Sequence, residues 1–193
     1  MYRLCSTEKA VEQQRMLCDS FLSLLLTEEY DDITISQICR NANLSRNVFY
    51  RLFEKKADVL YCLLDQSLLD CESYIPKANV GNGGLHRFLA FWLENKPLLD
   101  ALAKNNSTAL LLSRAVLHVL NEDSDLLRCF GAEDRESART LVVFYVGGIF
   151  SLVFDWHQQG YPQSIDQMSD VLKKILSTPP VKNPLQRNPG QFP

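Results

Sequence analysis

The hydrophobic and polar positions of this 193-residue chain recur mostly with the period of an α-helix. In the first long segment, about residues 7–28, the apolar positions share one helical stripe: Met16, Leu17, Phe21, Leu24 and Leu25. A run of leucines predicts a second long helix over about 56–74. Beyond it the pattern predicts five further helices, over about 85–94, 97–105, 107–129, 133–159 and 164–177. We therefore predict an all-α protein.

Two short helices are expected between the first two long ones. Thr34 is placed to cap a helix that ends near Ala42, and Ser45 is placed to cap a helix over about 46–54. Asn43 lies in the turn between them, where Asn tolerates a positive φ better than most residues do. Two short helices joined by so short a turn are typical of a helix-turn-helix. With these two, about nine helices are predicted.

Breaks in the pattern give the domain organisation. The clearest loop is 76–84, which contains Pro, Asn and three of the eight glycines. We predict a helix-turn-helix domain over 1–56 and a helical regulatory and dimerisation domain over 57–178. The Pro-rich tail, 179–193, is expected to be disordered because proline cannot propagate a helix.

Composition favours a soluble cytoplasmic protein. Apolar residues make up 46% of the chain and charged residues 22%, as in ordinary globular proteins. The six cysteines show no metal-ligand spacing, and the N-terminus lacks the apolar core of a secretory signal, so we expect reduced thiols. The most apolar stretch, 140–154, would span about 22 Å as a helix, which is short of a membrane core. We expect it to be a buried helix.

Positive charge is concentrated around the second short helix. The whole chain has a net charge of −3, but residues 34–56 carry five cations against Glu54 alone: Arg40, Arg46, Arg51, Lys55 and Lys56. Binding to phosphate depends on this local field rather than on the overall charge. A basic segment in an acidic chain therefore indicates a surface that meets nucleic acid.

The same helix separates into two faces at 100° per residue. The apolar arc holds Val48, Phe49, Leu52 and Phe53, and the polar arc holds Arg46, Asn47, Tyr50 and Arg51. Tyr50 stands among arginines, where a phenol can contact sugar and phosphate. Arg46 and Asn47 are side-chain types suited to guanine and adenine edges respectively. Arg51 is as consistent with a solvated or ion-paired arginine as with a DNA contact. Lys55 is consistent with a plain surface residue.

These residues resemble a known family. Residues 27–64, with the Thr34 cap, Leu44-Ser45, "FYRLF" and "KKADVL", are similar to the helix-turn-helix domain of TetR-family transcriptional regulators. The resemblance covers the whole chain and is most specific in its first third. Residues 143–176 resemble the last two helices of one subtype of that family, which form a four-helix bundle between two subunits. Gly147 and Gly148 would let two helices approach closely there.

The resemblance implies a role for each matching residue. Thr34 and Tyr50 would contact phosphate, Lys56 would anchor a phosphate at the start of the next helix, and Ser45, Arg46 and Asn47 would enter the major groove. Three positions depart from the family pattern. Asn43 replaces the usual glycine, Val48 stands where threonine is frequent, and Leu52 stands where His or Tyr is frequent. The last two remove polar groups that could contact DNA.

The function expected is that of a homodimeric, sequence-specific DNA-binding regulator, a ligand-responsive repressor of a near-palindromic operator. A small-molecule effector would bind the C-terminal domain, and no cofactor, metal or membrane is expected. We find no motif of an enzyme, such as GxSxG or a phosphate loop. The alternative is a helical adaptor or coactivator that keeps the fold and acts through a protein partner. Seven aromatic residues either line a ligand cavity or form plain core: Phe88, Phe91, Trp92, Phe144, Tyr145, Phe154 and Trp156.

Overall fold

The computed structural model describes residues 2, 7–75, 83–121 and 135–177, and its regular elements there are all α-helices. These residues form nine helices: α1 (Glu8–Thr27), α2 (Ile35–Asn41), α3 (Arg46–Leu52), α4 (Lys56–Tyr74), α5 (Gly84–Glu94), α6 (Lys96–Lys104), α7 (Thr108–Asn121), α9 (Arg135–Gln158) and α10 (Ile165–Ser177). The predicted all-α class is confirmed. The end of the helix predicted over 107–129, most of the predicted loop 76–84 and the predicted tail 179–193 lie outside the described residues.

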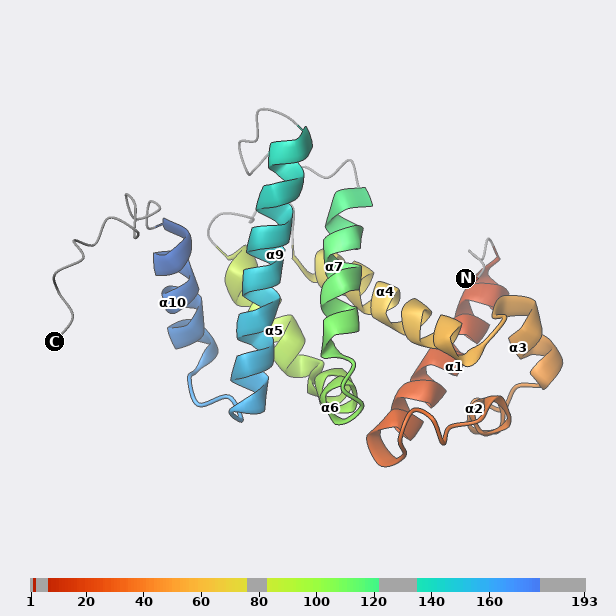
Figure 1. Cartoon of the computed structure of the whole chain (residues 1–193). Coiled ribbons are helices and arrows are strands. Elements are labelled where there is room, and N and C mark those ends of the chain that lie inside the picture. The colour runs from red at the N-terminus through yellow and green to blue at the C-terminus, as the bar shows by residue number, and fades with distance from the viewer. Residues whose placement is uncertain (1, 3–6, 76–82, 122–134, 178–193) are drawn as a thin grey trace, which may run out of the picture.

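Figure 1 shows which helices lie at each end of the molecule. α1, α2 and α3 gather at one end, α4 runs from that end into the middle, and α9 and α10 lie towards the other end. α1 packs against α4 and α6, α7 packs against α4 and α9, and α10 packs against α5. The predicted domain boundary at residue 56 stays a prediction, and it would coincide with the first residue of α4.

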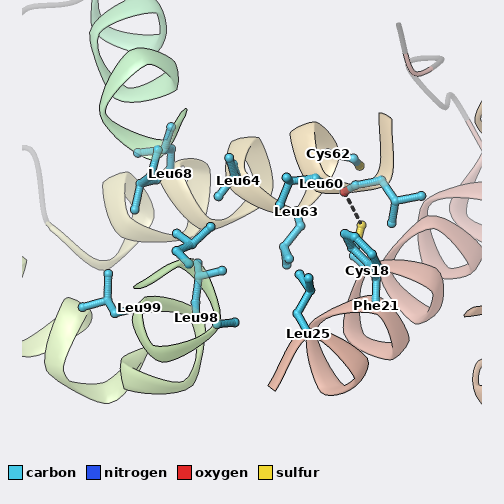
Figure 2. Close-up of a cluster of buried hydrophobic side chains, with 14 of the residues drawn as sticks. Cys18, Phe21, Leu25, Leu60, Cys62, Leu63, Leu64, Leu68, Leu98 and Leu99 are labelled. Atoms are coloured by element: carbon cyan, nitrogen blue, oxygen red, sulfur yellow. Dashed lines mark hydrogen bonds between the residues drawn. The ribbon is translucent and has the colours of Figure 1, made fainter. Parts of the chain in front are cut away.

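One hydrophobic core joins the first three helices to the rest of the molecule. In Figure 2, Phe21 and Leu25 of α1 meet Leu63 of α4, and the leucines of α6 lie against the same helix. Phe21 and Leu64 are fully buried in this cluster. Burial of apolar surface is the main stabilising term in such a contact. The first three helices are therefore held to the remainder, called the body below, by side-chain packing.

The four cysteines in the described part of the chain are free and buried: Cys18, Cys39, Cys62 and Cys71. Burial raises the pKa of the Cys71 thiol to about 12. A thiol that stays protonated is a poor nucleophile. Because all four are buried, they act as small hydrophobic residues of the core.

Aromatic side chains form the centre of the body. Phe150 of α9 packs edge-on against Phe88 and Trp92 of α5, with ring centroids 5.5 and 5.3 Å apart. Trp92 and Trp156 are at most 2% exposed, and Phe91 is also buried. For these three residues the structure supports plain core. Phe144 differs from them, because 71% of its surface is exposed.

The burial predicted for residues 140–154 is wrong for the single chain. The stretch belongs to α9, and the segment Arg139–Gln158 is by length and composition alone long and apolar enough to cross a membrane. Only 22% of its apolar window is buried. One side of α9 packs on α7, and Val143 and Phe144 remain exposed. The apolar pattern thus reflects a face of α9 that is not covered by the residues that the structure describes.

The three histidines connect helices within the body. His157 of α9 lies 2.8 Å from the Asp100 carboxylate of α6, His86 lies 3.2 Å from Asp166, and His118 lies 3.3 Å from Glu72. Each pair joins two different helices. Among the described residues, no group of three His, Cys, Asp or Glu side chains is placed to hold a metal ion.

Candidate nucleic-acid interface

The candidate interface starts with α2, which Thr34 caps as predicted. Thr34 has extended backbone angles, and its Oγ1 accepts a hydrogen bond from the backbone N–H of Gln37 at 3.2 Å. The Gln37 side chain accepts one in return from the Thr34 backbone N–H at 2.8 Å. Together they form a capping box, which satisfies two backbone donors at the start of the helix. Thr34 remains exposed at this end.

The turn between α2 and α3 is closed around Asn43. Asn43 has a φ of +52°, so the predicted left-handed residue is confirmed. Its N–H donates to the Arg40 carbonyl at 3.1 Å, and the Leu44 N–H donates to the Cys39 carbonyl at 2.9 Å. This pair of bonds is a Schellman motif, which ends a helix and redirects the chain within two residues. The turn therefore fixes the direction in which α3 leaves α2.

Asn43→Val is expected to lower the free energy of unfolding by about 1–2 kcal/mol, because a β-branched residue is strained at positive φ. Asn43→Gly is the matched control, because glycine adopts this conformation without strain and should leave stability nearly unchanged. Urea unfolding followed by circular dichroism measures both variants. Equal destabilisation by Val and Gly would show that the Asn side chain, rather than the backbone angle, matters at this position.

α3 presents one face to the core and the other to solvent. Phe49 and Leu52 are at most 3% exposed, and the half-buried Val48 packs beside them. Ser45 caps the helix by accepting a hydrogen bond from the Val48 N–H at 3.3 Å. The residues on the other face are exposed: Arg46, Asn47, Tyr50 and Arg51. The division into two arcs predicted from the sequence is therefore present in the structure.

Two of the exposed residues are paired with each other. Arg46 donates from Nη2 to the Tyr50 hydroxyl at 3.3 Å, and its guanidinium carbon lies 5.8 Å from the centre of the Tyr50 ring. This hydrogen bond raises the pKa of Arg46 above its ordinary value. Tyr50 is 46% exposed. A planar cation with five donors and a phenol are thus presented together to solvent.

Arg51 is engaged within the protein. Its Nη2 donates to the Gln13 side chain of α1 at 2.7 Å. The contact joins residues 38 positions apart in the sequence and holds the C-terminal half of α3 against α1. Whether Arg51 is a DNA contact or a solvated or ion-paired arginine stays open, because the observed partner is an uncharged amide on the protein surface.

Lys56 is also engaged within the protein, at the first position of α4. Its Nζ donates to the backbone carbonyls of Tyr30, Asp31 and Ile33, with the last bond at 2.7 Å. The ammonium group lies 4.3 Å from the centre of the Tyr30 ring. The phosphate contact expected of Lys56 stays a prediction, and it would require Nζ to leave some of these carbonyls. As it stands, Lys56 holds the turn between α1 and α2.

Comparison with known proteins shows which solved structures have a similar fold. No family model and no curated protein matches the chain. Among solved structures it is similar to Lin0861 from Listeria innocua, at 16% identity over 90% of this chain and 94% of that chain, with a TM-score of 0.66. It is also similar to AlkX, a TetR family repressor from Dietzia sp. strain DQ12-45-1b implicated in biodegradation of n-alkanes, at 18% identity over 84% and 92% of the two chains and a TM-score of 0.55. The chain has the TetR-family fold.

Within this TetR-family fold, the residues predicted to meet DNA fall into two groups. Ser45, Arg46 and Asn47 lie at the start of α3 and Tyr50 lies one turn later, and all four are exposed, as is Thr34 at the start of α2. Lys56 is half-buried under the α1–α2 turn. The similarity to AlkX and Lin0861 concerns the fold, and the roles of these side chains rest on their own chemistry.

Proposed function

We propose that this chain is a sequence-specific DNA-binding transcriptional regulator that acts in the cytoplasm as a homodimer on a near-palindromic operator. The observation that carries the proposal is the exposed face of α3, where Arg46, Asn47 and Tyr50 are presented by a helix-turn-helix in a TetR-family fold. Such a helix fits the major groove and reads base edges with its N-terminal residues. The regulator would be a repressor, as AlkX is, and not an enzyme.

The predicted site residues have two kinds of role in this proposal. Arg46 and Asn47 read bases in the major groove beside Ser45, while Thr34 and Tyr50 contact phosphates, and Lys56 adds a phosphate contact if Nζ leaves the turn. Phosphate contacts fix the register of the protein on the duplex, and base contacts select the sequence. Leu52 is buried and adds no polar contact.

Exposed apolar side chains on α9 and on α10, together called the face of α9 and α10, support a homodimer. Val143 and Phe144 on α9, and Val171 and Ile175 on α10, are 46–71% exposed in the single chain. A Cβ added at Gly147 or Gly148 would meet no described residue outside its own stretch of α9 within 4 Å, so packing among the described residues does not require glycine there. A second copy packing on this face would cover it through a two-fold, self-complementary contact. The two copies of α3 would then read half-sites on the order of 35 Å apart.

The proposal includes regulation by a small molecule. A small molecule bound in the body would favour one separation of the two α3 helices over another, and it would change DNA affinity by as much as its affinity differs between the two states. In a repressor, an effector that favours a separation of the two α3 helices that does not match the half-sites would release the protein from the operator.

Tyr50→Phe and Arg46→Ala test this proposal together. Tyr50→Phe removes the hydroxyl that would donate a hydrogen bond to a DNA phosphate, so we expect it to weaken binding on all sequences by a similar factor. Arg46→Ala removes a base contact, so we expect a loss of about 1–3 kcal/mol of discrimination at one base pair. Fluorescence anisotropy with matched and mismatched duplexes, repeated over a range of salt, measures both effects.

Arg87→Ala is the matched control, because it removes one exposed arginine from α5 in the body. It should leave the affinity and its salt dependence close to those of the unmodified protein. Equal losses from Arg46→Ala and Arg87→Ala would mean that only the overall charge matters, and the proposed role of α3 would be wrong.

A further inference from the structure

The C-terminal end of α6 reaches across to the first helix of the reading unit, which we define as α1–α3. Asn105, the residue that follows α6, donates from Nδ2 to the Leu25 carbonyl of α1 at 3.3 Å and to the Ala101 carbonyl at 2.8 Å. Its Oδ1 accepts a hydrogen bond from the Tyr30 backbone N–H at 2.7 Å. One amide thus satisfies a carbonyl in the last turn of α1 and a donor in the turn that follows.

The position of Asn105 is itself fixed by the backbone. Asn106 has a φ of +52°, and the Ser107 N–H donates to the Leu102 carbonyl at 2.8 Å. This is the same kind of helix ending that Asn43 makes after α2. Lys104 adds a bond from Nζ to the Leu26 carbonyl at 3.4 Å. The end of α6 is therefore ordered by its own turn and directed at the end of α1.

The turn held by Asn105 is held from the other side by Lys56. The Tyr30 N–H donates to Asn105, and the Tyr30 carbonyl accepts a hydrogen bond from Lys56. The Tyr30 ring packs edge-on against Phe21, with centroids 6.0 Å apart. Four residues later, Thr34 caps the start of α2. A shift of Tyr30 relative to α6 would therefore move the start of α2 and, through the rigid α2–α3 turn, the start of α3.

Asn105 makes its contacts at the place where the body and the reading unit share a core. Figure 2 shows side chains of α1, α4 and α6 meeting in that core, with Leu25 of α1 and Leu98 of α6 among them. Apolar contacts there are non-directional and tolerate small rotations. Hydrogen bonds have narrow limits of distance and angle. The Asn105 amide therefore adds a fixed orientation to a contact that packing alone leaves adjustable.

We propose that Asn105 is a positioning residue that sets the spacing between the two reading units by fixing the α1–α2 turn to the body. The proposal rests on the proposed function as a dimeric DNA reader. Asn105 touches no DNA in this arrangement and acts through Tyr30 and the start of α2. It determines which half-site separation the dimer accepts, while Arg46 and Asn47 determine which bases each half-site contains.

Asn105→Ala in the full-length protein tests the proposal on three kinds of duplex: the preferred operator, operators with one or two base pairs added or removed between the half-sites, and a single half-site. We expect affinity for the operator to fall about tenfold and the preference for one spacing to flatten, while half-site affinity stays within about twofold. A variant that lost half-site affinity by the same factor would show a merely local role in folding the reading unit, and the proposal would be wrong.

Asn95→Ala is the matched control, because Asn95 flanks the other end of α6 and donates to the Phe91 carbonyl at 2.9 Å within the body. It should bind every spacing as the unmodified protein does. If Asn105→Ala behaved as Asn95→Ala does on all the duplexes, the proposed role in spacing would be overturned.

Native-state hydrogen exchange provides a readout that needs no DNA. In Asn105→Ala the Tyr30 amide should exchange at least about tenfold faster, with the thermal midpoint and the amides of α9 little changed. Unchanged protection of Tyr30 would overturn the proposal even if the spacing preference shifted. If the unmodified protein bound no DNA, the proposed function would fail, whereas the exchange result would still decide whether Asn105 fixes the turn.

Discussion

Phe49→Ala is expected to lower the free energy of unfolding by about 3–5 kcal/mol, the usual range for removing a fully buried aromatic ring. Phe49 is 0% exposed, and its ring lies 5.5 Å from that of Tyr50 and 5.6 Å from that of Phe53. The loss is a large fraction of the total stability of about 5–15 kcal/mol that is typical of a protein domain. Urea unfolding monitored by circular dichroism would measure it.

Tyr50→Ala is the matched control, because it removes a ring of similar size from the next position of the same helix. Tyr50 is 46% exposed, so we expect a cost to stability of about 1 kcal/mol or less and a strong loss of DNA binding. The two variants therefore separate folding from binding along one helix. If Tyr50→Ala were the more destabilising of the two, the assignment of the two faces of α3 would be wrong.

Phe144→Asp is expected to convert the homodimer to a monomer at micromolar concentration. Phe144 is 71% exposed in the single chain, and burying such a side chain contributes about 1.5–3 kcal/mol. A two-fold interface contains the residue twice, and a buried carboxylate without a partner adds a further cost. We therefore expect the dimer dissociation constant to rise by roughly 10²–10⁴-fold. Sedimentation velocity over a series of concentrations would measure it.

Leu69→Asp is the control for the dimer prediction, because Leu69 is an apolar residue of α4 that is 50% exposed. It introduces the same charge outside the face formed by α9 and α10. A dimer that dissociates equally in both variants would point to a different interface. A dimer unaffected by Phe144→Asp would remove α9 from the interface altogether.

The sequence predicted the helices well because their signals are local. Thr34 and Ser45 cap α2 and α3 through contacts three residues away, and Asn43 ends α2 through bonds to residues just before it. The two faces of α3 follow from the helical period alone. Such features depend on neighbouring residues, so the order of residue types along the chain contains them.

The long-range contacts could not be predicted in this way. Asn105 and Tyr30 are 75 residues apart, and nothing near Asn105 in the sequence indicates that its side chain reaches the end of α1. The phosphate contact of Lys56 stays a prediction, but nothing in the sequence indicates that its ammonium group binds the turn that precedes α2, at Ile33, 23 residues away. The same limit explains why the burial predicted for residues 140–154 of α9 is wrong. An apolar helix has the same sequence pattern whether its partner belongs to the same chain or to a second copy.

Sequencing the DNA that the purified full-length protein enriches from a random pool at low salt tests the central claim most directly. We expect a near-palindromic motif whose half-sites are one helical turn or slightly more apart, on the order of 35 Å. In Arg46→Ala the motif should lose its preference at one position of each half-site. Recovery of the starting pool without any enriched motif would contradict DNA reading by α3 and would favour a helical adaptor that acts through a protein partner.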